Sequence, residues 1–227
     1  MVITSRQIVL PNLAPELLDN FADNEWSTII WACQTGNVPE TWTVGSQKAM
    51  TINGKDYLID IIGKNHDDYA AGGKAPLTFQ MHEVCANSTI NAGGTNVGGW
   101  ESCRIRVEQI PKWLGYMPTE VQSAIREVTK LSTAGNASSN IVTTADTLFL
   151  LATKEVFNSG DELGAQYEYY AAGNSKIKYD LSGTEKYWWL RNASTSDSTK
   201  FHCVSKIGGS GSSGSGSLWA MCFAFCF

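Results

Sequence analysis

The C-terminal region constrains the fold more than any other part of the chain. A run of large side chains, from Tyr187 to Arg191, leads into a stretch from Asn192 to Ser217 in which nine residues are Ser and five are Gly. The chain then closes on a second apolar run. A Ser/Gly-rich segment alone is typical of a flexible linker, but a linker is not followed by a run that must leave water. We therefore interpret residues 192–217 as a surface loop held between two core strands, and such loops commonly carry binding function.

The composition predicts one globular domain that folds without disulfides or metal ions. The chain has 227 residues, 43% of them hydrophobic, with eight each of Trp, Tyr and Phe, which is enough for a sizeable core. Its net charge of −5 excludes nucleic acid as a partner, because phosphates require clustered Lys and Arg. No apolar stretch approaches the ~20 residues that span a bilayer, so we expect no membrane insertion. Pro11 and Pro15 interrupt the region of a signal peptide, so synthesis is expected in the cytoplasm.

The sequence offers no catalytic or cofactor motif of high specificity. No Ser stands in a G-x-S-x-G motif, and the glycine pairs lack the context of a phosphate-binding loop. His82 with Cys85 and Cys103 is weighed as a partial zinc site, but no fourth ligand is indicated. The six cysteines contain no C-x-x-C pair and are interpreted as small buried hydrophobes. We therefore predict a protein that is not an enzyme, with no catalytic residue, no metal site and no cofactor.

Periodicity predicts two helices, mostly antiparallel strands and long loops. Asp23 is placed to cap a helix from Trp26 to about Gly36, and Thr119 with Gln122 forms a capping box for a second helix that runs to Leu131. Asn53-Gly54 between two β-rich runs predicts a tight hairpin. Other strands are expected at residues 42–44, 77–81, 147–152, 187–191, 201–206 and 218–227. This pattern is typical of an α+β domain, which we place at residues 23–227, after an N-terminal extension of residues 1–22.

Several expectations concern single side chains. Trp189, Leu190, Phe223 and Phe225 are expected in the core, with residues 187–191 and 218–227 paired in one sheet. Of the neighbours Trp188 and Trp189, one ring is expected to be half-exposed, because adjacent strand residues point to opposite faces. Arg191 is expected to bind a carboxylate or several carbonyls. The polar run His66-Asp67-Asp68 is interpreted as a solvated turn.

Five motifs stand out in the second half of the chain: Asp146-Thr147-Leu148-Phe149-Leu150-Leu151, Glu155-Val156, Tyr167-Glu168-Tyr169-Tyr170, Trp188-Trp189-Leu190-Arg191 and Phe223-Ala224-Phe225-Cys226-Phe227. Together they resemble a domain family of unassigned function that is common in gut bacteria and their phages. Members typically read W-W-L-R-S-P, then a hypervariable stretch, then G-V-R-P-A-F. This chain departs from that pattern at Asn192-Ala193 and at Ala220-Met221-Cys222-Phe223. The departure is explained either by divergence of the sequence or by Met221 and Cys222 being variable positions themselves. The Ser/Gly run at residues 208–217 is also compatible with laboratory design.

The resemblance implies a fold and a function. Some members of that family are targets of diversity-generating retroelements, in which an error-prone reverse transcriptase rewrites adenines in a C-terminal variable region displayed on a C-type-lectin-like fold. Rewriting of Asn codons yields Ser and Gly, so residues 192–222 are the expected variable region. The implied role is ligand binding, or receptor binding, on a phage tail in the virion or on a bacterial cell surface. The expected partner is a protein or glycan on a bacterial surface, and a homo-oligomer is left open.

The candidate ligand-binding residues follow from the implied role of residues 192–222 as a variable region. Two other classes of function stay open. The C-type lectin architecture also carries formylglycine-generating oxidases, which need a reactive cysteine pair, for which Cys203, Cys222 and Cys226 are candidates. A purely structural virion subunit, in which the loop does nothing, is the third class. The candidate ligand-binding residues are Asn192, Ser194, Thr195, Ser196, Asp197, Ser198, Lys200, His202, Ser205, Ser210, Ser212, Ser213, Ser215, Ser217, Trp219 and Cys222.

Overall fold

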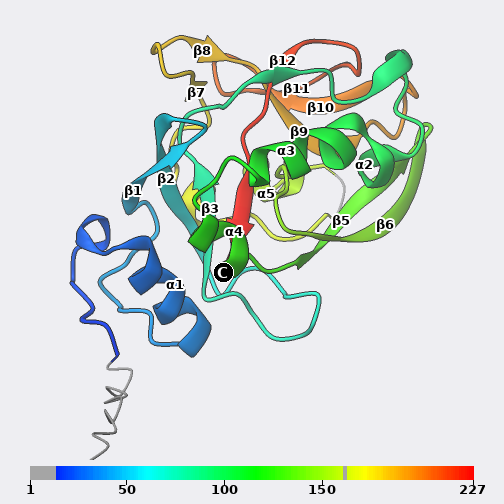
Figure 1. The fold of residues 1–227 in the computed structure, drawn as a ribbon. Coiled ribbons are helices and arrows are strands. Elements are labelled where there is room, and N and C mark those ends of the chain that lie inside the picture. The colour runs from blue at the N-terminus through cyan, green and yellow to red at the C-terminus, as the bar shows by residue number, and fades with distance from the viewer. Residues whose placement is uncertain (1–13, 161–162) are drawn as a thin grey trace, which may run out of the picture.

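Mostly antiparallel strands form two main sheets in the computed structural model, which describes residues 14–160 and 163–227 (Figure 1). The first sheet has the order β1 (Gln47–Ile52), β2 (Lys55–Lys64), β3 (Leu77–Met81), β13 (Ala224–Cys226). The second has the order β11 (Ser210–Gly214), β10 (Lys200–Val204), β9 (Trp188–Ala193), β12 (Trp219–Ala220), β4 (Asn87–Ser88). Two smaller sheets pair β5 (Val128–Gly135) with β6 (Ser138–Asp146) and β7 (Lys178–Tyr179) with β8 (Glu185–Lys186). The predicted α+β class is confirmed.

Six α-helices lie in the described part of the chain, whereas the sequence predicted two. α1 ends as predicted at Gly36, whose φ of 72° and ψ of 16° are those of a left-handed helix cap. Asp23 does not cap it but belongs to a preceding 3-10 turn. The helices are α1 (Trp26–Thr35), α2 (Gly99–Ser102), α3 (Ile110–Leu114), α4 (Thr119–Ala124), α5 (Thr153–Phe157) and α6 (Glu168–Ala171), with 3-10 turns η1 (Phe21–Asp23) and η2 (Ala92–Gly94) and a π-helical turn η3 (Ile105–Gln109).

The hairpin of β1 and β2 is formed where the sequence predicts it. Ile52 pairs with Lys55 across Asn53 and Gly54. These two turn residues have φ values of 52° and 69°. Positive φ at both positions is what a two-residue hairpin turn requires, and Asn-Gly meets that requirement with little strain. The predicted strand at residues 77–81 is confirmed as β3.

The second predicted helix is wrong beyond its first turns. α4 stops at Ala124, and the chain enters β5 at Val128 instead of continuing to Leu131. The Arg126 amide donates to the Cys226 carbonyl (3.0 Å), and Val128 bridges to Tyr69. These contacts with distant segments outweigh the local helical spacing of apolar residues. The predicted capping box is absent as well, since the residue before α4 is Pro118 and no side chain caps the helix.

Three predicted strands need correction. Residues 42–44 form a turn, in which the buried Trp42 indole donates to the Leu18 carbonyl (2.9 Å). Residues 147–152 are buried from Leu148 onward but make only a single bridge, from Phe149 to Ala224, within the described chain. Residues 218–227 divide between the two sheets, because β12 pairs with β9 while β13 pairs with β3.

The aromatic core is as predicted, with two additions. Trp189, Leu190, Phe223 and Phe225 are all fully buried. Trp188, expected to be half-exposed if Trp189 is buried, is buried too, because its indole donates to the Lys176 carbonyl (3.0 Å) of the segment that leads into β7. Phe21, in the predicted extension, also packs in this core. Residues 1–13 of that extension lie outside the described residues.

Candidate ligand-binding surface

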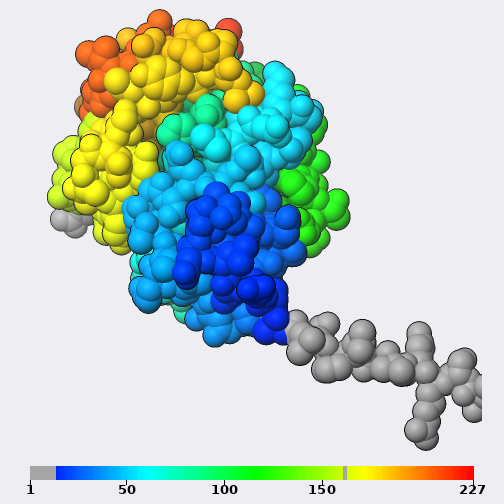
Figure 2. All heavy atoms as spheres, turned by 90° about the vertical axis from the view of Figure 1, so that its left-hand side faces the viewer, coloured from blue at the N-terminus to red at the C-terminus, as the bar shows by residue number. Residues whose placement is uncertain are grey.

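Twelve of the sixteen candidate residues are exposed or half-exposed, and they gather at one end of the molecule. They come from the loop 195–199, from the hairpin of β10 and β11, and from the turn into β12. Figure 2 shows the orange and red atoms of this region at the top of the molecule, beside the yellow atoms of the segment before β9. We call these twelve residues the display surface. They are Thr195, Ser196, Asp197, Ser198, Lys200, His202, Ser205, Ser210, Ser212, Ser213, Ser217 and Trp219.

The other four candidates, Asn192, Ser194, Ser215 and Cys222, are buried, so their side chains do not face solvent. Asn192 Oδ1 accepts hydrogen bonds from the amide and hydroxyl of Thr153 (3.1 and 3.0 Å). Ser194 Oγ accepts from the amide of Asp197 (3.2 Å), which closes a turn. The main chain of Ser215 forms hydrogen bonds inside the fold. The Cys222 thiol donates to the Met81 carbonyl (3.2 Å). These four side chains lie beneath the display surface.

The loop 194–200 is held by Asn96, a residue that the sequence analysis did not single out. Asn96 is fully buried, and its Nδ2 group donates to the carbonyls of Ser194 (3.2 Å), Asp197 (2.9 Å) and Lys200 (2.9 Å). Its own amide donates to the Ser198 carbonyl (2.7 Å). One side chain therefore fixes the course of the loop through main-chain atoms alone. Asn96 lies in the loop between η2 and α2, where polar residues are common, so composition gave no signal for it.

Asn96 is itself held in place by the turn between β5 and β6. Its Oδ1 accepts from the Asn136 amide (2.7 Å). The neighbouring Gly135 has a φ of 78°, and a Cβ atom there would lie 1.9 Å from the Asn96 carbonyl oxygen. Only glycine permits this approach. The anchor of the loop thus depends on the turn at residues 135–137, which lies more than fifty residues earlier in the chain.

The hairpin of β10 and β11 presents small side chains on a fixed ladder. Lys200 to Val204 pair antiparallel with Gly214 to Ser210. In β10, Phe201 and Cys203 point into the core, and His202 between them is half-exposed. The strand opposite contains only Ser and Gly, so its side chains contribute little to packing. The conformation of the hairpin rests on its backbone and on β10.

The display surface is mainly polar, with large apolar side chains at its border. Asp197 accepts hydrogen bonds from Thr199 and pairs with Lys200 Nζ (2.9 Å), and these contacts lower its pKa to about 2. The Trp219 ring stacks on Tyr187, with ring centroids 4.6 Å apart. Ile207 is 86% exposed at the hairpin turn and Leu218 is 62% exposed before β12. The surface therefore offers hydroxyls, one ion pair and several apolar contacts.

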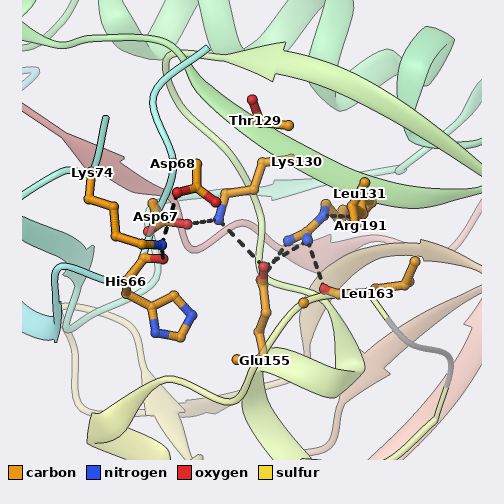
Figure 3. A pocket seen from close by; sticks show the side chains of 12 residues that line it. His66, Asp67, Asp68, Lys74, Thr129, Lys130, Leu131, Glu155, Leu163 and Arg191 are labelled. Carbon is orange, nitrogen blue, oxygen red and sulfur yellow. Dashed lines mark hydrogen bonds and ion pairs between the residues drawn. The ribbon is translucent and has the colours of Figure 1, made fainter. Parts of the chain in front are cut away.

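A buried ion network lies at the base of this region (Figure 3). Arg191, at the end of the predicted apolar run, forms a bidentate ion pair with Glu155 (2.6 and 2.7 Å). Lys130 of β5 binds Asp67, the Glu155 carboxylate (3.4 Å) and the Tyr167 hydroxyl (2.9 Å). The network lines a cavity of about 320 Å³ that is open to solvent on the side of His66, Asp68 and Lys74. The expected partners of Arg191 are confirmed, whereas Asp67 is buried and not in a solvated turn.

The donors of this network are fully used. The remaining N–H groups of Arg191 donate to the carbonyls of Leu131 (2.9 Å), Leu150 (2.9 Å) and Leu163 (3.4 Å). Because Lys130 has three partners for three hydrogens, neither cation has a donor left for a ligand. Burial alone would raise the carboxyl pKa values, but Arg191 and Lys130 hold the Glu155 pKa below its usual value, and Lys130 lowers the Asp67 pKa to about 2. The network is therefore a structural clamp.

Comparison with models of protein families places residues 76–220 in a domain of unknown function, DUF6273. This match covers more than half of the chain. The chain belongs to the DUF6273 family. The expected membership in a family of unassigned function is thereby confirmed. Comparisons with curated proteins and with solved structures found no match.

The DUF6273 match includes the parts that build the candidate surface. It contains Asn96, Glu155, Arg191 and the whole display surface, from the loop 195–199 to Trp219. It leaves out α1, β1 and β2, which precede it, and β13, which follows it. The match therefore includes the strands β9 to β12 and the ribbon of β5 and β6, while Asp67 of the ion network lies before it.

Groups that could support other chemistry in this DUF6273 protein are buried or already bonded. Burial raises the pKa values of Cys203 and Cys222 to about 11 and that of Cys226 well above its usual value. His82 binds Asp60 through Nδ1 (2.9 Å). Among the described residues, no three His, Cys, Asp or Glu side chains are grouped to hold a metal ion, so His82, Cys85 and Cys103 do not form one together. No helix in residues 14–160 and 163–227 has the length and apolar character to cross a bilayer.

Proposed function

We propose that this protein is a non-enzymatic ligand-binding protein whose display surface carries diversified side chains on a C-type-lectin-like scaffold. The observation that carries the proposal is the attachment of the loop 194–200 to Asn96, a residue outside the loop, through carbonyl groups. Every residue type has the same main-chain carbonyl. A new side chain at Thr195, Ser196 or Ser198 therefore leaves the anchor intact. A fixed backbone with replaceable side chains suits the recognition of varied ligands.

The chemistry of the surface supports recognition and not catalysis. Ser, Thr and Asp provide adaptable hydrogen bonds, while Trp219, Ile207 and Leu218 provide contact area at its border. Antibody binding sites likewise combine small polar side chains for hydrogen bonding with large aromatic side chains for contact area. With so many small side chains, this variant has few of the large anchors that supply most binding energy. We expect it to bind weakly.

The pattern of burial supports diversification by a retroelement that rewrites adenines. Three positions of β10 inside the variable region are in the core, Phe201, Cys203 and Val204, and the codons of Phe and Cys contain no adenine. The exposed positions around them are occupied mainly by Ser and Gly, which one and two A-to-G changes, respectively, produce from Asn codons. Such mutagenesis would change the surface and spare the core. The proposed setting is a phage tail or a bacterial cell surface, with a protein or glycan on a bacterial surface as the partner.

The two rival functions receive less support. An oxidase of the formylglycine-generating type needs a reactive thiolate, and thiolates are favoured by partial exposure and nearby positive charge. Cys203, Cys222 and Cys226 are buried, and their pKa values are raised. A purely structural subunit would not require the loop backbone to be anchored while its side chains stay exposed.

The neighbouring DNA tests the origin of the surface. A reverse transcriptase gene together with a near-copy of the sequence that encodes residues 192–222, differing mainly at adenines, would support the proposal. A near-copy whose differences fall on the codons of the core positions Phe201 and Cys203 as often as on those of the display surface would contradict it.

A binding experiment tests the function directly. A library that varies Thr195, Ser196, Ser198, Ser212 and Ser213 is selected on bacterial cells, and selected clones are compared with the parent chain. We expect clones with gained affinity that unfold at the same denaturant concentration as the parent. As a matched control, selected clones that also carry Asn96→Ala should lose affinity, because the loop is no longer held. A large library that folds but yields no binder would favour the structural subunit.

A further inference from the structure

The ribbon of β5 and β6 has one edge that is covered by the rest of the fold. In an antiparallel pair, the main-chain groups of alternate residues point toward the partner strand, and those of the residues between them point away. The amide of Thr129 donates to the Asp68 carbonyl (2.9 Å), and the carbonyl of Leu131 accepts from Arg191 Nε (2.9 Å). These two residues of β5 therefore point away from β6, toward the body of the molecule.

The register between the two strands then fixes which main-chain groups of β6 point away from β5. Ala145 lies opposite Thr129, and Thr143 lies opposite Leu131. The main-chain groups of Ala145, Thr143 and Ile141 consequently point away from β5. Arg106 covers the first of them, since its Nη2 donates to the Ala145 carbonyl (3.1 Å). In the part of the chain that the structure describes, the outward groups of Thr143 and Ile141 have no hydrogen-bond partner. Figure 1 shows β6 along the side of the molecule opposite α1.

The main sheets protect most of their edges. Phe149 closes the edge of β13 by exchanging two main-chain hydrogen bonds with Ala224 (3.0 and 2.8 Å). The Trp26 indole covers the middle of β1 by donating to the Ala49 carbonyl (3.0 Å). The edge strand β4 is only two residues long. Among the described residues, β11 pairs with β10 alone, so its outer edge is also open. Open edges are the places where another strand can add.

β6 is better suited than β11 to bind another strand. Residues 138–145 contain no charged residue and no proline, and Ile141 to Thr144 are four β-branched residues in a row, which favours strand pairing. The Ile141 side chain is 45% exposed, so pairing would remove apolar surface from water. β11 contains only Ser and Gly and would bury almost none.

We propose that β6 is a self-association edge, at which two copies of this chain pair β6 with β6 antiparallel about a two-fold axis. The register that matches the outward groups sets Ile141 of each copy opposite Thr143 of the other, with Val142 at the axis. Both Ile141–Thr143 pairs then exchange their N–H and C=O groups, and the two ribbons merge into one continuous sheet. A strand that pairs with itself across a two-fold axis forms a closed dimer and not a filament.

The composition of β6 favours a second copy as its partner, because the uncharged segment 138–145 offers no ion pair to an acidic or basic foreign strand. The chain has a net charge of −5, so two copies repel each other over most of their surfaces. The segment 138–145 is uncharged, and the two-fold arrangement brings no like charges face to face within it. The interface is small, and small interfaces belong to transient complexes. We therefore expect dissociation in the micromolar to millimolar range of protein concentration.

Sedimentation of the full chain over a wide concentration range tests the proposal. We expect the apparent mass to rise from that of the monomer toward twice that value. Ile141→Lys should weaken association at least tenfold, because the substitution removes the apolar side chain and sets a charged one against a neutral strand. The matched control is Ser212→Lys, which adds the same charge to the other open edge, on β11, and should leave association unchanged. Melting curves of both variants should match the parent, since both positions are exposed.

The double variant Ile141→Lys with Thr143→Glu tests the register. Each introduced lysine would face the glutamate of the other copy, so the double variant should recover the association that Ile141→Lys loses. A parent chain that stays monomeric at every concentration would overturn the proposal. Association that survives Ile141→Lys, or that Ser212→Lys abolishes, would also overturn it and point to β11 or to another surface. A monomeric parent that binds an extended peptide in an Ile141-dependent way would assign the edge to a foreign strand.

Discussion

Arg191 and Lys200 are nine residues apart, and each forms an ion pair, yet the two pairs differ in their surroundings. The side chains of Arg191 and Glu155 are 1% and 4% exposed, while those of Lys200 and Asp197 are 44% and 35% exposed. An exposed pair contributes about 0–1 kcal/mol to stability. Loss of one partner of a buried pair leaves an uncompensated charge and costs about 3–5 kcal/mol. Within a few residues, the chain thus changes from side chains on which the stability of the fold depends to side chains that contribute little to it.

The largest effect is expected at the buried pair. Arg191→Ala leaves the Glu155 carboxylate without its main partner and removes the donor from three carbonyls, so we predict a loss of about 3–5 kcal/mol in the free energy of unfolding. Urea denaturation measures it. Lys200→Ala is the matched control, and its effect should stay within about 0.5 kcal/mol. If Arg191→Ala also stays within about 0.5 kcal/mol, the network does not hold the fold.

A smaller loss is expected at the anchor of the loop. Asn96→Ala removes the donor from three main-chain carbonyls, and each buried group left without a partner costs about 1–3 kcal/mol. Because water can reach part of the loop, we predict a total loss of about 2–3 kcal/mol. Hydrogen exchange should rise in the loop 194–200 and not in β3. Asn140→Ala, on the exposed side of β6, is the control and should change neither quantity.

Acid should weaken the network in a defined direction. The pKa of Asp67 is lowered to about 2 in the folded protein, so its contribution is fully present above the unfolded pKa, near 4, and is lost as the pH falls toward 2. Linkage gives a loss on the order of 2 kcal/mol from this group. Glu155, whose pKa is also lowered, adds to the loss. Urea denaturation at a series of pH values measures it, and Asp67→Asn should flatten the profile. Equal pH dependence in that variant would contradict the assignment.

The smallest effect is expected on the display surface. Replacement of Ser196, Ser198, Ser210 and Ser213 by Tyr, Asn or Asp should change the free energy of unfolding by no more than about 0.5 kcal/mol each. The same replacements at Ser215, which is buried, should be clearly destabilising. Thermal melting of the two sets separates them. Loss of cooperative unfolding in the exposed set would mean that these side chains belong to the core.

Elements whose residues carry strong local signals could be predicted from the sequence. The β1–β2 hairpin follows from Asn53-Gly54, α1 from its apolar spacing and Gly36, and the buried aromatic residues from their position beside a polar segment. The partner type of Arg191 was predicted as well. In each case, the information lies within a few neighbouring residues.

Features determined by distant parts of the chain could not be predicted in this way. The spacing of Val121, Ile125 and Val128 fits a helix, yet pairing with Tyr69 and Cys226 turns the second half into a strand. Asp67 was interpreted as solvated because its neighbours are polar, and only the fold brings Lys130 to it. Asn96 is an ordinary loop residue by composition. The burial of four candidate binding residues also depends on distant segments, as when Asn192 binds Thr153 and Cys222 binds Met81.

The attachment of the loop 194–200 to Asn96 has a consequence for how a population of variants would fail. If many sequences share this loop backbone, all of them depend on the same amide group, whatever side chains they carry. A single codon change at Asn96 would then disable the whole repertoire at once, while a change at any one exposed Ser affects one specificity. Selection on the repertoire should therefore act most strongly at a position that never touches a ligand.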